Sequence, residues 1–436
     1  MKTVAFHNLG CKVNAYELDI IEQKFTENGF QVVPFSQKAD IYVINTCTVT
    51  NMADRKSRQM LHRAKALNPD SVVVAMGCYV QTSPDAVKSD DAVDIAIGNN
   101  TKTSIIDILN EYYETKEKQS NIIDINHTSE YEAMMLTDTS DRTRAYIKIQ
   151  DGCNQFCSYC LIPYARGRVR SRDMKEILEE IEGITKKGYK EVVLTGIHVS
   201  SYGITDPNDL SQNKLAELLE EIEKIPTVER IRLSSLEPRV VTEEFAKRIS
   251  KLTKLCPHFH LSLQSGSDAT LKRMNRHYTA SQYLEGVNIL RKYFDDPAIT
   301  TDVIVGFPGE TEEEFRQSYE FCERVGFFEM HIFKYSKRKG TVAEKLPNQV
   351  SDADKDKRSD MMLELEERLS KAYRERHIGK EAVALFEEKK KINGKCYYIG
   401  HTPEYIKVAM EVDTPMENET KRVMPKDFLT DEILRV

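Results

Sequence analysis

Apolar strand-like runs alternate with amphipathic helical stretches along most of this 436-residue chain. The first hundred residues contain four such runs: TVAFHNLG, ADIYVINT, SVVVAMG and VDIAIG. Strands that alternate with helices predict parallel sheets with helices packed on their faces. A chain of this length favours two or three such domains over one. The pattern therefore predicts a multidomain α/β protein.

Changes in this pattern divide the chain into five segments. Residues 1–115 repeat the strand–helix unit and predict a Rossmann-like parallel sheet, and the polar residues 116–143 are interpreted as a linker with room for a short strand. Residues 144–350 hold six strand candidates, too few for an eight-unit barrel of about 250 residues, so they predict a partial (β/α)6 barrel. Residues 351–376 predict a charged connecting helix, and residues 377–436 predict a small antiparallel β module.

Composition narrows the classes of function. Hydrophobic residues make up 40% and charged residues 30%, as in soluble globular proteins, and no apolar run is long enough to span a membrane. The start MKTVAFHNLG is interpreted as a first strand rather than a signal peptide, so a cytoplasmic location with reduced thiols is expected. The net charge of −7 gives no global sign of nucleic-acid binding, so an RNA partner would need a local basic surface.

Three of the nine cysteines each follow one of the first three strand candidates. This strand-end triplet consists of Cys11, Cys47 and Cys78. Their separations of 36 (47 − 11) and 31 (78 − 47) residues fit one strand–helix–strand unit of roughly 30 residues or more. Because parallel strands end at one edge of a sheet, the three thiols are expected to converge there, where ligand crevices open.

Three further cysteines lie within the eight residues CNQFCSYC. This loop triplet consists of Cys153, Cys157 and Cys160. Three thiolates on one loop can hold three corners of a [4Fe–4S] cluster and leave one iron open to a ligand. A zinc site with a distant fourth ligand is the alternative reading of the spacing. The remaining cysteines, Cys256, Cys322 and Cys396, lack partner spacing and are treated as ordinary residues.

Two cysteine triplets in this order resemble those of the methylthiotransferases, a family within the radical S-adenosylmethionine (SAM) superfamily. Members join an amino-terminal cluster domain, a partial barrel and a carboxy-terminal TRAM domain, so the resemblance covers essentially the whole chain. The segments NLGCKVNAYELD and CNQFCSYCLIPYARGRVRSR are closest to the branch that modifies N6-threonylcarbamoyladenosine at position 37 of tRNA. The isopentenyladenosine branch usually carries GCQMN-like segments instead, and the ribosomal-protein branch carries FCAIPSFRG-like segments.

The resemblance implies radical chemistry with two [4Fe–4S] clusters and two uses of SAM. The loop triplet would hold the cluster that cleaves SAM to a radical, and the strand-end triplet would hold an auxiliary cluster that carries the sulfur to be methylated. The radical would remove hydrogen from C2 of adenine, a C–H bond that acid–base catalysis cannot open, and the methylated sulfur would join that carbon. The implied partners are the anticodon loop of tRNA and an electron donor such as flavodoxin or ferredoxin.

Residues near the ends of the barrel strands are expected to line the SAM pocket, because functional sites of β/α barrels form at that face. Tyr159 matches the family's aromatic residue near the adenine of SAM, and Arg276 is a candidate partner for the SAM carboxylate. The other candidates are polar or small residues: Thr195, Gly196, Ser235, Glu237, Gln264 and Asp302.

Two segments offer candidate RNA contacts. The segment ARGRVRSR carries arginines at alternate positions, which would share one phosphate-binding face if the segment is extended; they are Arg166, Arg168, Arg170 and Arg172. The β module resembles an RNA-binding barrel with Phe386, Tyr398 and Tyr405 as candidate base contacts. From His377 onward, ten Lys and Arg residues against eleven Asp and Glu residues depart from a strongly basic RNA module.

Three rival hypotheses remain at this level. A methylthiotransferase of the same class could act on isopentenyladenosine or on a ribosomal protein. An iron–sulfur RNA-binding regulator would not cleave SAM when reduced, and a zinc-stabilised scaffold would contain no iron. The open corner expected at CNQFCSYC favours a catalytic site over both non-catalytic hypotheses.

Overall fold

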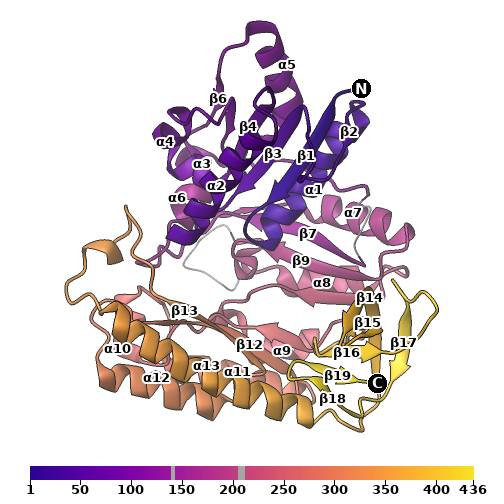
Figure 1. The fold of residues 1–436 in the computed structure, drawn as a ribbon. Helices are drawn as coiled ribbons and strands as arrows, with labels where there is room; N and C mark the ends of the chain where they lie inside the picture. The colour runs from indigo at the N-terminus through magenta and orange to yellow at the C-terminus, as the bar shows by residue number, and fades with distance from the viewer. Residues whose placement is uncertain (139–142, 205–211) are drawn as a thin grey trace.

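A six-stranded parallel sheet forms the amino-terminal domain in this computed structural model, which describes residues 1–138, 143–204 and 212–436 (Figure 1). The strand order is β2-β1-β3-β4-β5-β6. The strands are β1 (Thr3–Asn8), β2 (Gln31–Val32), β3 (Ile41–Thr46), β4 (Val72–Gly77), β5 (Ile95–Ile97) and β6 (Gln119–Asn121). The apolar runs of this domain are continuous because both faces of the sheet are buried: Val43 packs in one core cluster and its neighbour Ile44 in another.

Helices cover both faces of this sheet. They are α1 (Lys12–Glu27), α2 (Asn51–Leu67), α3 (Cys78–Thr82), α4 (Pro84–Lys88) and α5 (Ile105–Thr115). Helix α1 contributes Ile21 and Phe25 to the core cluster that contains Val43, whereas α2 contributes Leu61 to the cluster that contains Ile44. The domain thus has three layers, and the carboxyl end of β4 leads directly into α3, which packs against α6 (Ile162–Arg166) of the second domain.

Six parallel strands form the predicted partial barrel. They are β7 (Arg144–Asp151), β9 (Glu191–Gly196), β10 (Arg230–Leu233), β11 (His258–His260), β12 (Ala298–Val305) and β13 (Glu329–Lys334). A short strand, β8 (Arg170–Ser171), adds antiparallel to β7. Parallel bridges such as Leu236 to Leu261 join the β10 and β11 halves, and β7 and β13 do not pair, so the barrel is open.

Most helices of the second domain lie on the outside of the barrel, whereas α6 packs against α3 of the first domain. The helices of this domain are α6 (Ile162–Arg166), α7 (Met174–Lys186), α8 (Leu215–Glu223), α9 (Glu243–Ile249), α10 (Asp268–Arg273), α11 (Ala280–Tyr293), α12 (Glu312–Val325) and α13 (Asp352–Glu375). Capping boxes begin α11 at Thr279 and α12 at Thr311, which satisfies backbone donors at both helix starts. Helix α13 runs beside α12 and packs on β13 (Figure 1).

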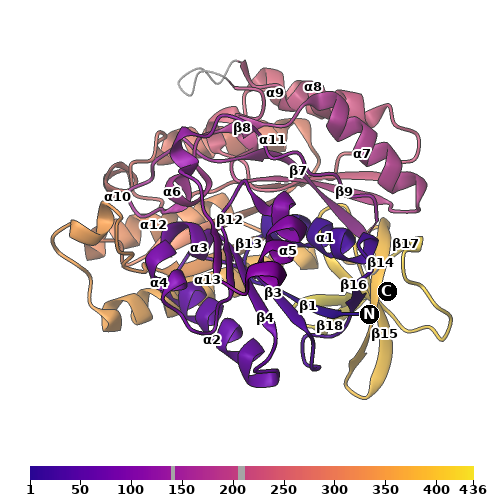
Figure 2. The same cartoon turned by 90° about the horizontal axis from the view of Figure 1, so that it is seen from above.

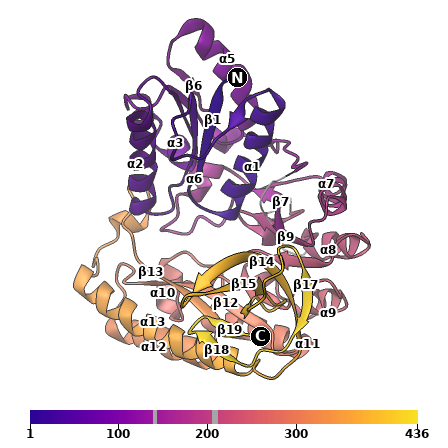
Figure 3. The ribbon, with the colours of Figure 1, turned by 45° about the vertical axis from the view of Figure 1, so that its right-hand side comes forward.

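A six-stranded, mostly antiparallel sheet follows α13. Its strands are β14 (Ala382–Ile392), β15 (Lys395–His401), β16 (Lys407–Met410), β17 (Thr420–Val423), β18 (Asp427–Thr430) and β19 (Ile433–Arg435). Only the β16–β19 pair is parallel among the pairs of this sheet. Figure 3 brings this module forward, and it lies against the barrel below the amino-terminal domain.

The segment expected as a linker is partly structured. β6 extends the first sheet into it, and Met134 and Leu136 are buried in the core cluster that the first two domains share. The Tyr16 hydroxyl donates to the Met134 carbonyl at 3.0 Å, so the segment packs between the domains rather than spanning free space. Residues 139–142 of the predicted linker lie outside the described residues. Among the described helices, none combines the length and apolarity needed to cross a bilayer.

Candidate functional site

The strand-end triplet lies at one edge of the first sheet. β1, β3 and β4 are adjacent and parallel, and Cys11, Cys47 and Cys78 follow them within three residues. Gly10 has φ of +111°, and a Cβ there would lie 3.1 Å from the Cys47 sulfur, so the loop before Cys11 passes against Cys47. Three thiols from distant positions in the chain therefore meet at the carboxyl edge of the sheet.

The three thiols of this triplet differ in exposure. Cys47 and Cys78 are buried, whereas Cys11 is exposed. Burial raises the pKa of Cys47 to about 11, so a metal that binds this thiol must displace its proton. The Cys78 sulfur accepts hydrogen bonds from Arg166 Nε at 3.3 Å and Asn99 Nδ2 at 3.6 Å. Hydrogen-bond donors that point at a sulfur stabilise the thiolate form, which is the form that binds a metal or cluster.

The loop triplet lies at the carboxyl end of β7, the first barrel strand. Gly152 precedes it with φ of +73°, and a Cβ at Gly152 would lie 1.8 Å from the Arg168 carbonyl oxygen, so only glycine fits. The Cys153 N–H donates to the Gly167 carbonyl at 3.0 Å, which closes the loop back onto the end of α6. The three cysteines thus sit on a folded loop at the functional face of the barrel.

Each sulfur of the loop triplet accepts one hydrogen bond. The donors are the Gln155 N–H to Cys153 at 3.5 Å, the Ile162 N–H to Cys160 at 3.4 Å, and Arg276 Nη1 to Cys157 at 3.3 Å. Burial raises the pKa of Cys153 to about 12, so this thiol too must lose a proton when it becomes a ligand. One donor per sulfur fits three thiolate ligands of one cluster.

A buried polar network joins the two triplets. Arg166 belongs to α6, directly after the loop triplet, and its Nη2 donates to Asn14 Oδ1 at 2.6 Å on α1. Arg166 also pairs with Glu17, which in turn accepts from Lys148 Nζ at 2.8 Å. Burial would raise the pKa of Glu17, but the cations around it, Lys102 included, hold that pKa well below its usual range. Buried charges therefore join the two domains next to both cysteine triplets, where α3 of the first domain packs against α6 of the second (Figure 2).

The structure contradicts the prediction that the four arginines of ARGRVRSR form one phosphate-binding face. Arg166, Arg170 and Arg172 are buried, and Arg172 pairs with the buried Glu180. The segment is not extended throughout, because α6 ends at Arg166 and only Arg170–Ser171 is strand. Arg168 alone among the four is exposed. The sequence carries no signal for the polar side chains that contact Arg166 and Cys78, because these contacts depend on how the two domains pack. These side chains are Asn14, Glu17 and Asn99.

A partly exposed aromatic rim borders the loop triplet. The Arg168 guanidinium lies 4.5 Å from the ring centre of Phe156, and the Tyr164 ring lies edge-on to Phe156 at 6.1 Å. Tyr164 is 44% exposed, which is unusual for a large aromatic side chain and leaves a ring face open. Exposed rings beside a cation are typical of surfaces that stack nucleic-acid bases.

The expected SAM contacts lie mostly at the ends of the barrel strands. Thr195 and Gly196 end β9, and the exposed Ser235 and the buried Glu237 follow β10. Glu237 pairs with Arg239 at 2.6 Å, while its Oε2 is buried with no hydrogen-bond partner in the described residues. Gln264 follows β11 with φ of +70°.

Three further SAM candidates have defined neighbours. Tyr159 packs edge-on to Phe307 at 6.3 Å, so it bridges the loop triplet and the turn after β12. Arg276 donates to the sulfur of Cys157 and, at 3.2 Å, to the Ser262 carbonyl. Asp302 lies inside β12 rather than at its end, and its carboxylate faces His260.

The structure also contradicts the prediction that three aromatic residues of the β module contact RNA bases. Phe386 and Tyr398 are buried in the core of the module. The Tyr405 hydroxyl accepts from Arg144 at 2.8 Å, and the Arg232 guanidinium lies 4.7 Å from its ring centre. Both arginines come from barrel strands, so Tyr405 docks the module onto the barrel and is not free to stack on RNA.

Comparisons with known proteins agree with this arrangement. A family model described as "Radical SAM superfamily" matches residues 147–322, and one described as "Uncharacterized protein family UPF0004" matches residues 3–98. A Bacillus subtilis protein named threonylcarbamoyladenosine tRNA methylthiotransferase MtaB is 42% identical over 94% of this chain and 91% of its own length. An Acetivibrio thermocellus protein named tRNA-2-methylthio-N(6)-dimethylallyladenosine synthase is 34% identical over 91% of this chain and 83% of its own.

Among solved structures, the radical SAM methyltransferase TsrM from Kitasatospora setae resembles the chain with a TM-score of 0.55. The match covers 76% of this chain and 75% of that one at 16% identity, which supports the fold alone. The relatives, in contrast, share sequence over nearly the full length, including both cysteine-bearing domains. The chain therefore belongs to the radical SAM family of tRNA methylthiotransferases.

Proposed function

We propose that this chain attaches a methylthio group to C2 of N6-threonylcarbamoyladenosine at position 37 of tRNA. Family membership implies SAM and a [4Fe–4S] cluster, and the proposal adds a second cluster and this substrate. The observation that carries the proposal is the placement of two cysteine triplets on facing edges of two domains, joined through Arg166. A substrate between them could meet a radical source and a sulfur source at once.

In this proposal the loop triplet holds the cluster that binds SAM. Three cysteines leave one iron without a protein ligand, and when bound there the cluster supplies the electron that cleaves SAM. Arg276 donates to Cys157 and keeps a cation beside the site, which would stabilise the thiolate and the carboxylate of SAM. Glu237, with one unpartnered buried oxygen, could accept a hydroxyl proton of the ribose in a hydrogen bond.

The strand-end triplet holds the auxiliary cluster in this proposal. Cys11 is exposed while Cys47 and Cys78 are buried, so the site would open toward the barrel on the Cys11 side. Arg166 and Asn99 fix the position of Cys78. Asn14 donates to the Leu9 carbonyl, in the loop before Cys11, and to the carbonyl of Thr46, the last residue of β3 before Cys47. These contacts would hold the two clusters at a constant separation.

The choice of adenosine derivative rests on similarity. The relative named for threonylcarbamoyladenosine is 42% identical, against 34% for the relative named for dimethylallyladenosine. The segments around Cys11 and Cys160 also resemble the branch that modifies threonylcarbamoyladenosine. The rim beside the loop triplet, formed by the half-buried Phe156 and the exposed Tyr164 and Arg168, offers a surface for the bases flanking position 37.

The test uses purified holoprotein with SAM, a reductant and two tRNAs, one carrying threonylcarbamoyladenosine and one carrying isopentenyladenosine. Nucleoside mass spectrometry should find a methylthio group on the first only. Deuterium placed at C2 of the adenine should appear in 5′-deoxyadenosine. Modification of the isopentenyl tRNA alone would move the chain to the other branch, and SAM cleavage with no modified tRNA would point to another substrate.

The clusters are tested separately from the substrate. Replacing Cys153, Cys157 and Cys160 by Ala should halve the iron content and abolish SAM cleavage. Replacing the strand-end triplet should also halve the iron but leave slow SAM cleavage without methylthio transfer. Zinc instead of iron in the wild-type protein after anaerobic purification would support the scaffold hypothesis.

A further inference from the structure

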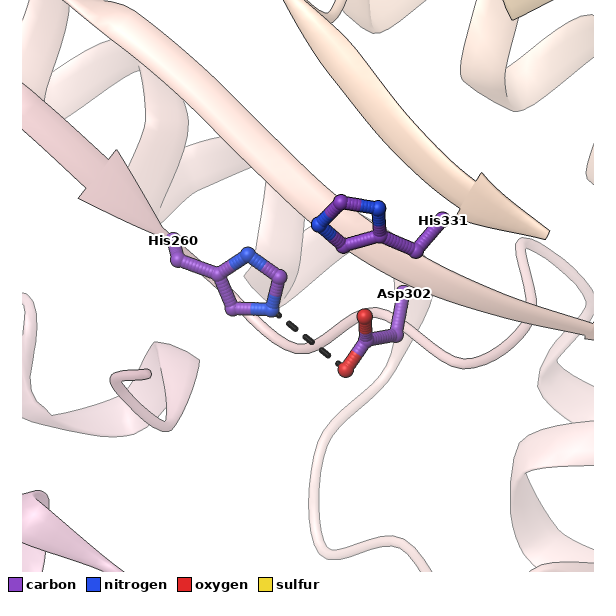
Figure 4. A group of neighbouring side chains, drawn as sticks. All are labelled: His260, Asp302 and His331. Carbon is purple, nitrogen blue, oxygen red and sulfur yellow. Dashed lines mark ion pairs between the residues drawn. The ribbon is translucent and has the colours of Figure 1, made fainter. Parts of the chain in front are cut away.

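Three side chains that belong to neither cysteine triplet converge on the inner face of the barrel. They are His260 on β11, Asp302 on β12 and His331 on β13 (Figure 4). One ligand atom from each lies within 4.8 Å of the other two. Histidine and carboxylate side chains in such a group are the ligands that divalent transition metals use in proteins.

Strand register builds this group. In the parallel ladder His260 pairs with Thr300, and Asp302 pairs with His331. Phe259, Ile299 and Val303 pack in the main core cluster, so the alternate residues point to the opposite, inner face. All three side chains therefore stand on rigid strands, which fixes their positions better than a loop would.

The His260 ring is oriented for a ligand. Its Nδ1 lies 3.0 Å from Thr300 Oγ1, the kind of supporting contact that leaves the other ring nitrogen facing a metal. Its Nε2 lies 3.4 Å from Asp302 Oδ2 and, although buried, makes no hydrogen bond in the described part of the chain. A ring nitrogen that faces a carboxylate either carries a hydrogen, as in the neutral Nε2–H tautomer, or shares a metal ion with that carboxylate.

The third side chain distinguishes these two cases. The His331 ring stacks with the His260 ring at 5.9 Å between centres and brings a second imidazole to the same point. A proton shared by His260 and Asp302 would need no third group. Two ligands about 2.0–2.1 Å from a tetrahedral ion lie about 3.4 Å apart, the spacing found between His260 Nε2 and Asp302 Oδ2.

We propose that His260, Asp302 and His331 bind a divalent transition-metal ion, Zn²⁺ or Fe²⁺, as a third metal centre separate from both cysteine triplets. Two imidazoles and one carboxylate leave at least one coordination position for water or an anionic oxygen. His331 is exposed, so this position opens to the interior of the barrel. Asp302 is thereby a metal ligand rather than a contact for SAM.

Zinc binding by the holoprotein tests this assignment, because zinc is counted separately from cluster iron. Cluster-loaded protein is dialysed anaerobically against a series of buffered Zn²⁺ concentrations, and zinc and iron are measured by mass spectrometry. The wild-type protein should take up one zinc per chain with its iron unchanged. Asp302→Asn and His331→Ala should weaken zinc binding at least about tenfold, the smallest loss expected even for a supporting partner.

A surface His–Asp pair provides the matched control. His62 lies 3.1 Å from Asp90 and is exposed, but neither belongs to the three-ligand group. His62→Ala should bind zinc like the wild type. Iron content and the unfolding midpoint report whether each variant is folded, and the exposed His331 tolerates truncation best. A wild-type protein that takes up no zinc, or a folded His331→Ala protein that binds zinc as tightly as the wild type, overturns the proposal.

Discussion

The Nε atom of Arg166 lies 3.3 Å from the sulfur of Cys78, although the two residues are 88 positions apart in the chain. Arg166 follows the loop triplet in the barrel domain, and Cys78 belongs to the strand-end triplet of the other domain. One side chain thus connects both cysteine sites. Its guanidinium is fully buried and also pairs with Glu17, so the contact is part of the interior and not a surface feature.

Loss of the Arg166 charge should disable the strand-end site. Arg166→Gln leaves Glu17 with fewer cations and removes a donor to Cys78, a change that costs about 3–5 kcal/mol for a buried ion pair. We expect iron to fall from about eight to about four atoms per chain, while tRNA affinity stays near that of the wild type. Iron analysis and a tRNA binding titration measure both effects.

Arg168→Gln is the matched control two residues away. Arg168 is exposed, so this change should leave iron content unaltered. If the two variants lose iron equally, or if Arg166→Gln lowers only tRNA affinity, the structural role assigned to Arg166 is wrong.

The aromatic rim should contribute to tRNA binding. Tyr164→Ala removes an exposed ring next to Phe156 and should weaken tRNA binding by about 1–3 kcal/mol, the typical contribution of one stacked base. Both iron content and SAM cleavage without tRNA should stay unchanged. Tyr113→Ala, at a half-buried tyrosine on α5 of the first domain, serves as the comparison. Equal affinities for the wild type and Tyr164→Ala would remove the rim from the tRNA surface.

Arg276 should tune the cluster of the loop triplet. Its cation donates to the sulfur of Cys157, and a hydrogen bond to a cluster sulfur stabilises the reduced, more negative state. Arg276→Gln should therefore lower the reduction potential, by on the order of tens of millivolts, and slow SAM cleavage. The titration is followed by electron paramagnetic resonance in a background in which the strand-end triplet is replaced by Ala. Arg276→Lys keeps the charge and should retain part of the shift; an unchanged potential in both variants would contradict this role.

The sequence predicts the fold well because strand and helix periodicities are local. The six barrel strands and the strand-end positions of Cys11, Cys47 and Cys78 follow from them. Contacts between domains are not local, and they explain the errors. Arg166, Arg170 and Arg172 look like a basic surface in the sequence, yet all three are buried. Arg166 pairs with Glu17 of the first domain, and Arg172 pairs with Glu180 on α7.

The base contacts predicted in the carboxy-terminal β module differ from the structure for a similar reason. Alternation of apolar and polar residues predicts a β module, but it does not reveal which aromatic residues pack inside it. Phe386 and Tyr398 lie in its core, and Tyr405 contacts Arg144 and Arg232 of the barrel. A histidine on one strand and a carboxylate on the next, as in His260 and Asp302, likewise become a group only once the strand register is known.

Arg232 should hold the β module against the barrel. It donates to Glu191 Oε1 at 2.7 Å and to the Pro403 carbonyl at 2.9 Å, and it is almost fully buried. Arg232→Met removes the nearest cation from the buried Glu191 and leaves the more distant Arg230, a loss of a buried ion pair that costs about 3–5 kcal/mol. We expect faster limited proteolysis between α13 and β14. Arg435→Met, which breaks an exposed pair with Asp427, should leave the cleavage rate unchanged; equal rates for all three proteins would show that Arg232 does not dock the module.

His198, at the end of β9, should make stability fall on the acid side of neutrality. Burial, with the charges of Arg276 and Arg239, lowers the pKa of His198 to about 3, so the folded protein keeps it neutral. The unfolded chain binds a proton near pH 6.5, so the unfolded state gains stability as the pH falls below that value. Between pH 8 and pH 6 this effect costs the native state about 0.8 kcal/mol. Thermal unfolding of cluster-loaded protein should show this extra loss relative to His198→Gln, whose side chain does not titrate. The same pH slope in both proteins would mean that His198 is not a buried neutral imidazole.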